Sequence, residues 1–168
     1  MLIRAEAAHD AAAIGAVNDA AFGRPAEGKL VAALRTAARP IISLVADENS
    51  AVIGYILFSP VALTGHAELK IMGLAPMAVV PGQQRQGVGS AMIRAGLEEC
   101  RRLGFGAAVV LGHPEYYPRF GFRPAKEFGI GCEYDVPAEA FMAVELTPEY
   151  LRGKTGTIHY HPAFGAVG

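Results

Sequence analysis

The sequence has few charges and few cysteines for its length. Asp, Glu, Lys and Arg make up only 18% of its 168 residues, against about 25% in an average soluble protein, and 52% of the residues are hydrophobic. A chain with so much apolar surface to bury is not disordered. Its length is that of one domain with a single hydrophobic core.

Basic clusters and long apolar runs are also absent. The formal net charge is −1 and no four Lys or Arg residues stand together, so nucleic acid and anionic membranes are not expected as partners. The longest apolar stretch, Val52 to Leu63, is interrupted by Ser59-Pro60 and is shorter than the roughly 20 residues that span a bilayer. No signal-peptide pattern follows Met1. We therefore expect a soluble, cytoplasmic protein.

The two cysteines, Cys100 and Cys132, form neither a CxxC motif nor a Cys/His ligand spacing. This argues against a disulfide framework and against a structural zinc site, and it fits a reducing compartment. His159 and His161 are two residues apart on a possible strand and so share a face, but no third ligand accompanies them. We predict no metal.

Hydrophobic spacing predicts the N-terminal elements. Residues 2–5 are a short strand candidate, and a helical pattern follows Asp10, a candidate N-cap, as far as Gly23. A second helix ends before Pro40, because the residue before a proline is disfavoured in the helical region. Residues 41–46 and 51–58 are rich in β-branched and aromatic residues and predict a β-hairpin around the polar turn 47–50.

A strand-helix-strand unit is predicted in the middle of the chain. An extended segment, 68–80, precedes an amphipathic helix whose apolar face runs from Met92 to Leu103, and 107–111 is typical of a strand buried on both faces. Weaker patterns predict a short helix over 114–120 and strands over 141–146 and 157–160. The order predicts a mixed α/β (α+β) fold: a central sheet with antiparallel N-terminal strands, a βαβ core and helices on both faces.

The clearest functional signal is the loop between that strand and that helix, Pro81-Gly82-Gln83-Gln84-Arg85-Gln86-Gly87-Val88-Gly89-Ser90. The first N–H groups of a helix have no internal partner, and together with the positive end of the helix dipole they favour phosphate. Gly87 and Gly89 lack a Cβ, so a pyrophosphate can approach the backbone there. By itself the loop is equally compatible with an ordinary strand-to-helix turn.

Two motifs together resemble the GNAT superfamily of acetyl-CoA-dependent N-acetyltransferases. The segment Gln84-Arg85-Gln86-Gly87-Val88-Gly89 matches that superfamily's Q/R-x-x-G-x-G/A pyrophosphate signature. The segment Tyr116-Tyr117-Pro118-Arg119-Phe120-Gly121-Phe122 resembles its F/Y-Y-x-x-x-G-F segment after the fifth strand. The resemblance covers residues 1–146 and implies a GNAT-like acetyltransferase domain over that range, followed by an extension of residues 147–168.

The resemblance also implies a role for each matching residue, with acetyl-CoA as co-substrate. The backbone of Met77, Ala78 and Val79 would pair with the pantetheine arm. The pyrophosphate would be bound by the amides of Arg85, Gln86, Gly87, Val88, Gly89 and Ser90. Tyr117 falls on the tyrosine that protonates the departing thiolate, and a phenol, with a pKa near 10, is still protonated at pH 7. The alternative for Tyr117 is simple packing beside Phe120.

The general base is less evident. Some members of the superfamily carry a Glu on the fourth strand, and the matching position, by loop length, is Gly73. Glu68, His113 and Glu115 are the remaining candidates, and water is a further one.

Neither cysteine offers a convincing acyl carrier, because Cys100 lies on the core face of its helix and Cys132 has no evident base beside it. The resemblance therefore predicts direct transfer of the acetyl group to a primary amine in a ternary complex. A non-catalytic acyl-CoA-binding or sensing module on the same fold is the alternative.

The chain after Phe122 has an acidic bias from Glu127, Glu133, Asp135 and Glu139. It would attract a cationic amine or simply form a solvated loop. The extension contains the apolar residues Tyr150, Ile158, Tyr160 and Phe164, too much surface to leave in water. We expect the extension to pack on its own domain or on a second subunit, in a homodimer.

Overall fold

The computed structural model describes residues 1–166, in which nine strands and three α-helices are present. The helices are α1 (Ala11–Phe22), α2 (Ala26–Ala37) and α3 (Val88–Arg102). The strands are β1 (Leu2–Ala5), β2 (Ile42–Glu48), β3 (Ala51–Leu63), β4 (Ile71–Val79), β5 (Ala107–Leu111), β6 (Arg123–Pro124), β7 (Ile130–Cys132), β8 (Phe141–Glu145) and β9 (Gly156–His159). Two compact units divide the chain. The first comprises residues 1–59, 75–96 and 162–166, and the second comprises residues 60–74 and 97–161.

In the first unit, β1, β2, β3 and the end of β4 are neighbours in that order. β1 and β2 are antiparallel, and so are β2 and β3, which pair from Ile42 with Phe58 to Glu48 with Ala51. The predicted hairpin is confirmed, with β3 continuing past Ser59-Pro60 to Leu63. The missing N–H of Pro60 breaks no pairing on this edge, because β2 pairs with β3 only as far as Phe58 and β9 pairs with it only from Ala62.

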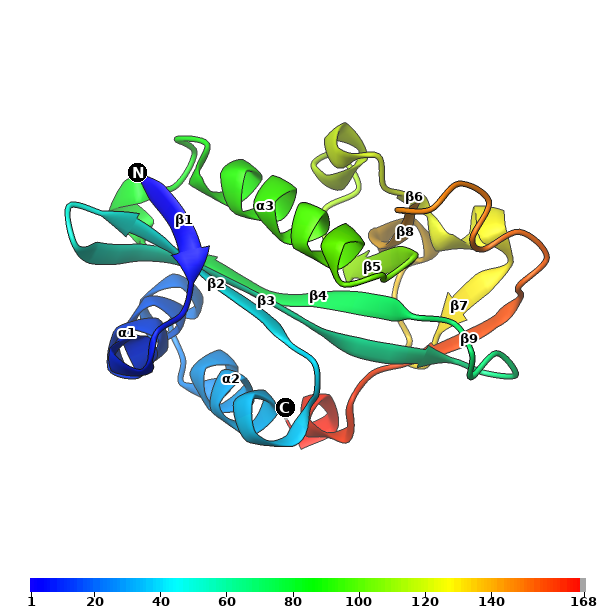
Figure 1. Ribbon diagram of the computed structural model, residues 1–168, viewed down its shortest axis with the longest axis horizontal. Coiled ribbons are helices and arrows are strands. Elements are labelled where there is room, and N and C mark those ends of the chain that lie inside the picture. The colour runs from blue at the N-terminus through cyan, green and yellow to red at the C-terminus, as the bar shows by residue number, and fades with distance from the viewer. Residues whose placement is uncertain (167–168) are drawn as a thin grey trace. The chain divides into compact units, whose positions relative to one another are not determined.

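Alternate residues of β3 face different helices, because side chains alternate along a strand. Phe58 packs against α3 so closely that a Cβ on Gly96 would overlap its ring. Tyr55 and Leu57 point the other way, into a buried cluster with Ile14 of α1 and with apolar residues of α2. Figure 1 shows α3 on one face of this part of the sheet and α1 and α2 on the other. The expected helices on both faces are confirmed here.

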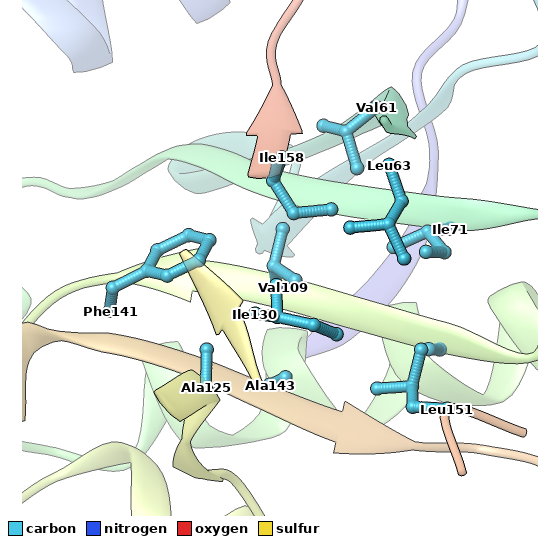
Figure 2. Close-up of a cluster of buried hydrophobic side chains, with 11 residues drawn as sticks. Val61, Leu63, Ile71, Val109, Ala125, Ile130, Phe141, Ala143, Leu151 and Ile158 are labelled. Carbon is cyan, nitrogen blue, oxygen red and sulfur yellow. The ribbon is translucent and has the colours of Figure 1, made fainter. Parts of the chain in front are cut away.

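In the second unit, the start of β4 is followed in the sheet by β5, β8 and β6. β4 and β5 are parallel and α3 lies between them in the chain, which confirms the predicted βαβ order, and β5 and β8 are antiparallel. β9 pairs with the end of β3 and with β7. These strands enclose the cluster drawn in Figure 2, composed of Val61, Leu63, Ile71, Ala107, Val109, Ala125, Ile130, Phe141, Ala143, Leu151 and Ile158.

Several local expectations differ from the structure. α3 begins at Val88, inside the segment 81–90 expected to be a loop, and the helix expected over 114–120 is a short 3₁₀ helix, Tyr117–Phe120. Asp10 precedes α1 as expected but does not cap it. Its carboxylate instead accepts the Ala7 N–H at 2.6 Å and two bonds from the Arg4 guanidinium at 2.7 and 3.0 Å. β6 and β7 were not predicted, since two or three residues carry no periodic signal.

Apolar side chains of the C-terminal residues are covered by this chain itself. Ile158 on β9 lies in the cluster of the second unit, and the Tyr150 hydroxyl there accepts the Lys70 N–H at 2.7 Å. Phe164 packs on the cluster that α1 and α2 form in the first unit. None of the helices among residues 1–166 is long and apolar enough to cross a membrane.

Candidate active site

The loop before α3 turns through two left-handed residues. Gly87 has a φ of 85° and Arg85 a φ of 64°, and a Cβ on Gly87 would meet no atom within 4 Å. Glycine is favoured at such a φ, and here it also leaves the space beside the backbone open. The first hydrogen bond of α3 runs from the Ala91 N–H to the Gly87 carbonyl at 3.0 Å, so the N–H groups of Val88 and Gly89 precede it. The positive end of the helix dipole therefore faces an open, glycine-lined loop.

Two glutamine side chains fold back on this loop. Gln84 Nε2 donates to the Val79 carbonyl at 2.9 Å, and Gln86 Nε2 donates to the Gly82 carbonyl at 3.5 Å. The Arg85 side chain is exposed. The glutamines thus fasten the loop to its own backbone and to the end of β4, while the guanidinium remains at the surface.

The pairing of β4 with β5 stops short of the last residues of β4. Pairing of β4 with β5 runs from Ile71 to Leu74 and does not include Met77, Ala78 or Val79. Ala78 is buried, and Met77 and Val79 are half-buried. Beyond them, the Val80 N–H donates to the Ile53 carbonyl of β3 at 2.9 Å. At this point the backbone of β4 is held on its β3 side and lies outside the β5 ladder. A ligand that binds like an added strand requires such an edge of a strand.

Tyr117 is buried in an aromatic cluster of the second unit. It is 7% exposed, and its ring centroid lies 5.2 Å from that of Tyr116 and 5.6 Å from that of Phe122, edge to face in both cases. Burial, and secondarily the neighbouring Tyr116, raises the pKa of Tyr117 to about 12. The phenol is therefore protonated throughout the neutral range and is a hydrogen-bond donor.

Gly112 makes room for Tyr117, and sequence reasoning did not single it out. A Cβ at position 112 would overlap the Tyr117 ring. The only signal in the sequence is a glycine directly after the apolar strand 107–111, which is too common to be informative. Its importance appears only when the ring is placed.

The candidate bases are exposed or absent. Gly73 has no side chain, and a Cβ there would lie 2.8 Å from Val61 Cγ1 and 3.0 Å from Tyr160 Cε1. Glu68 is exposed, 3.6 Å from His66 Nδ1. His113 and Glu115 are exposed as well, and the His113 carbonyl accepts the Tyr117 N–H at 3.4 Å. None of these side chains is held in a buried position.

The two cysteines and His159 are the remaining side chains that the sequence offered as chemical candidates. Burial raises the pKa of the Cys100 thiol to about 12, and it raises the pKa of the half-buried Cys132 thiol as well. His159 Nδ1 lies 3.0 Å from Glu133 Oε2, so this histidine has a carboxylate partner. Across residues 1–166 no three His, Cys, Asp or Glu side chains are grouped as metal ligands.

Known proteins resemble this chain over nearly its whole length. The sequence profile of the acetyltransferase (GNAT) domain family matches residues 40–124. The N-acetyltransferase YhbS of Escherichia coli K12, itself uncharacterised, is 38% identical over 165 residues, 98% of each chain. The chain belongs to the GNAT family of acetyltransferases. It is accordingly an acyltransferase, and the GNAT-like fold predicted from the two motifs is confirmed.

Two solved GNAT structures were obtained with the cofactor bound. The crystal structure of E. coli YhbS in complex with CoA superposes with a TM-score of 0.93 at 36% identity, covering 99% of this chain and 93% of that one. A GNAT acetyltransferase from Brucella melitensis in complex with acetyl-CoA gives a TM-score of 0.81 at 38% identity, covering 97% of each chain. Acetyl-CoA is therefore the cofactor of this family fold, as expected from the loop motif.

Proposed function

We propose that this GNAT enzyme transfers the acetyl group of acetyl-CoA to a primary amine by direct attack in a ternary complex. The observation that carries the proposal is the open left-handed turn at Gly87, directly before the first turn of α3. Such a turn suits the pyrophosphate of acetyl-CoA. The stretch Met77 to Val79 of β4, which lies outside the β5 ladder, suits the pantetheine arm.

The state of the two thiols supports direct attack. A covalent acyl carrier requires a thiolate, and burial raises the pKa of both Cys100 and Cys132. The amine nitrogen then attacks the thioester carbonyl itself, and the carbon–sulfur bond breaks as the amide forms. The Tyr117 hydroxyl donates a hydrogen bond to the sulfur as the carbon–sulfur bond breaks, the CoA thiolate takes its proton from solvent, and the amine gives its surplus proton to water.

Cofactor binding can be tested by thermal unfolding. Acetyl-CoA at about 100 times its Kd should stabilise the protein by roughly 2.7 kcal/mol and raise Tm. Gly87→Glu should abolish this shift, because it places a carboxylate where the pyrophosphate lies. Gly153→Glu is the matched control, since Gly153 is exposed, has a φ of 72° and has open space beside it, so strain and charge are the same. Equal shifts in both variants would show that the Gly87 loop does not bind the cofactor.

Catalysis can be tested by thiol release from acetyl-CoA in the presence of an amine panel. The panel should include small metabolites, aminoglycosides, peptide N-termini and lysine side chains. At least one class should stimulate thiol release well above hydrolysis. Cofactor binding without stimulation by any amine would favour an acyl-CoA-sensing module, for which the lack of a side chain at Gly73 is the supporting observation.

We further propose a cytoplasmic homodimer in which residues 1–146 form the catalytic domain and residues 147–168 an extension. Two free thiols suit a reducing cytoplasm. Exposed apolar side chains at Leu2, Phe22 and Leu111 are available for a subunit contact, whereas those of the extension are already covered by this chain. Light scattering at micromolar concentration should give the mass of a dimer, and a monomer would contradict this.

A further inference from the structure

Arg85, in the loop before α3, presents its positive charge to solvent. Seven of the eleven arginines of the chain form ion pairs with carboxylates. The Arg85 guanidinium, in contrast, forms no ion pair or hydrogen bond with residues 1–166, and the Arg85 side chain is exposed. No carboxylate of the described chain therefore neutralises this charge.

The sequence around Arg85 carries no negative charge. No Asp or Glu occurs between Glu68 and Glu98, and the charged residues of that stretch are Lys70, Arg85 and Arg94. The N-terminus of α3 lies in the same stretch and adds the positive end of the helix dipole. This part of the chain is therefore complementary in charge to a ligand that carries several phosphates.

The Arg85 side chain leaves the turn at Gly87 open. A Cβ on Gly87 would meet no atom within 4 Å, so the guanidinium does not fill the space beside that turn. Arg85, Gly87 and the first turns of α3 all belong to the first unit. The backbone N–H groups at the start of α3 and the Arg85 guanidinium are thus two separate sets of donors, and a pyrophosphate on the first set leaves the second set for another phosphate.

We propose that the Arg85 guanidinium binds the 3′-phosphate of CoA, so that the enzyme prefers CoA to its 3′-dephosphorylated form. This rests on the proposed function, in which the turn at Gly87 binds the pyrophosphate. Besides the pyrophosphate, CoA carries a phosphate on the 3′-oxygen of its ribose. A guanidinium donates two parallel hydrogen bonds to one phosphate, which gives the site both affinity and geometric selectivity.

A thermodynamic cycle with two ligands and two proteins tests this assignment. Calorimetry gives the Kd of CoA and of dephospho-CoA for the parent and for Arg85→Gln, which keeps the backbone amide and is, like arginine, a non-glycine residue at a φ of 64°. The parent should bind CoA roughly three- to tenfold more tightly than dephospho-CoA. In Arg85→Gln this ratio should fall to about one, while the Kd of dephospho-CoA stays within about twofold of the parent value. Arg85→Lys should keep part of the preference, because it retains the charge without the fork.

Arg101→Gln is the matched control for the loss of one positive charge. Arg101 lies in the last turn of α3, where it pairs with Glu98 at 3.1 Å, and its replacement should leave the ratio of the two Kd values as in the parent. Equal weakening of both ligands in Arg85→Gln would place the guanidinium on the pyrophosphate and overturn the inference. Equal affinity of the parent for the two ligands would overturn it as well. If the parent binds neither ligand, the proposed function itself fails.

Salt and steady-state kinetics give further readouts. The Arg85 side chain is exposed, so raising the ionic strength from about 0.05 M to about 0.5 M should reduce the preference of the parent for CoA. With the acetylated form of each cofactor and an active amine, Arg85→Gln should raise the KM for acetyl-CoA and leave kcat unchanged, because the 3′-phosphate takes no part in breaking the thioester. A preference for CoA that persists in Arg85→Gln would show that other groups bind the 3′-phosphate, against the inference.

Discussion

The Tyr117 hydroxyl should control the rate of acetyl transfer, and its surroundings allow the size of the effect to be estimated. Tyr117 is buried, and edge-to-face contacts with Tyr116 and Phe122 hold its ring. Tyr117→Phe preserves these contacts and removes only the proton donor. The fold should therefore hold, and the affinity for acetyl-CoA should change by less than about tenfold.

The raised pKa of Tyr117 determines how large a loss of kcat we expect in Tyr117→Phe. A phenol with a pKa of about 12 is a weaker acid than a simple thiol, whose pKa is about 8.5. At 1.36 kcal/mol per pH unit, complete transfer of the proton to a free thiolate would be uphill by about 5 kcal/mol. The hydroxyl therefore acts mainly by donating a hydrogen bond as the carbon–sulfur bond breaks. We expect a loss near the lower end of the range for general acids, about 100-fold in kcat or about 2.7 kcal/mol.

The assay is thiol release with an active amine at saturating acetyl-CoA, with calorimetry to follow cofactor binding. Tyr116→Phe is the control, because its ring packs in the same cluster, and it should retain most of the activity. A loss confined to Tyr116→Phe would show that the motif has been assigned one residue out of register. Full activity in both variants would show that the leaving sulfur needs no hydrogen bond from Tyr117 and that Tyr117 only packs.

Two further predictions concern stability. Gly96→Ala adds a Cβ that overlaps the Phe58 ring and should lower the unfolding free energy by about 1–3 kcal/mol. Gly15→Ala in α1 is the control, because its Cβ would meet no atom within 4 Å, and it should raise the unfolding free energy by up to about 1 kcal/mol. Equal changes of the two variants in chemical denaturation would refute the close approach of α3 to β3. Hydrogen bonds from Arg4, and then from the Ala7 N–H, hold the pKa of Asp10 far below its usual range. This stabilisation is present above the unfolded-state pKa of about 3.9 and is lost as the pH falls below it. Between about pH 5 and pH 3 the Tm of Asp10→Asn should therefore fall less than that of the parent, and parallel curves would contradict the assignment.

Local patterns in the sequence were sufficient for the elements that depend on neighbouring residues. Gly23, with a φ of 69°, ends α1, and α2 ends at Ala37 before Pro40, because these residue types act on the backbone beside them. The loop that contains Gly87 was found for the same reason, since a glycine motif between a strand and a helix is a local signal. The mixed α/β fold followed from the order of these elements.

Contacts between distant residues were decided only by the tertiary structure. Gly112 makes room for the Tyr117 ring, and Tyr160 reaches Gly73 across more than half of the chain, yet neither glycine differs in sequence from one in an ordinary turn or strand. The length of β4 that extends beyond the β5 ladder likewise depends on where the pairing with β5 stops, at Leu74. Packing of side chains and pairing of strands depend on which surfaces meet after the chain has folded, and such long-range contacts leave no periodic trace in the segments that make them.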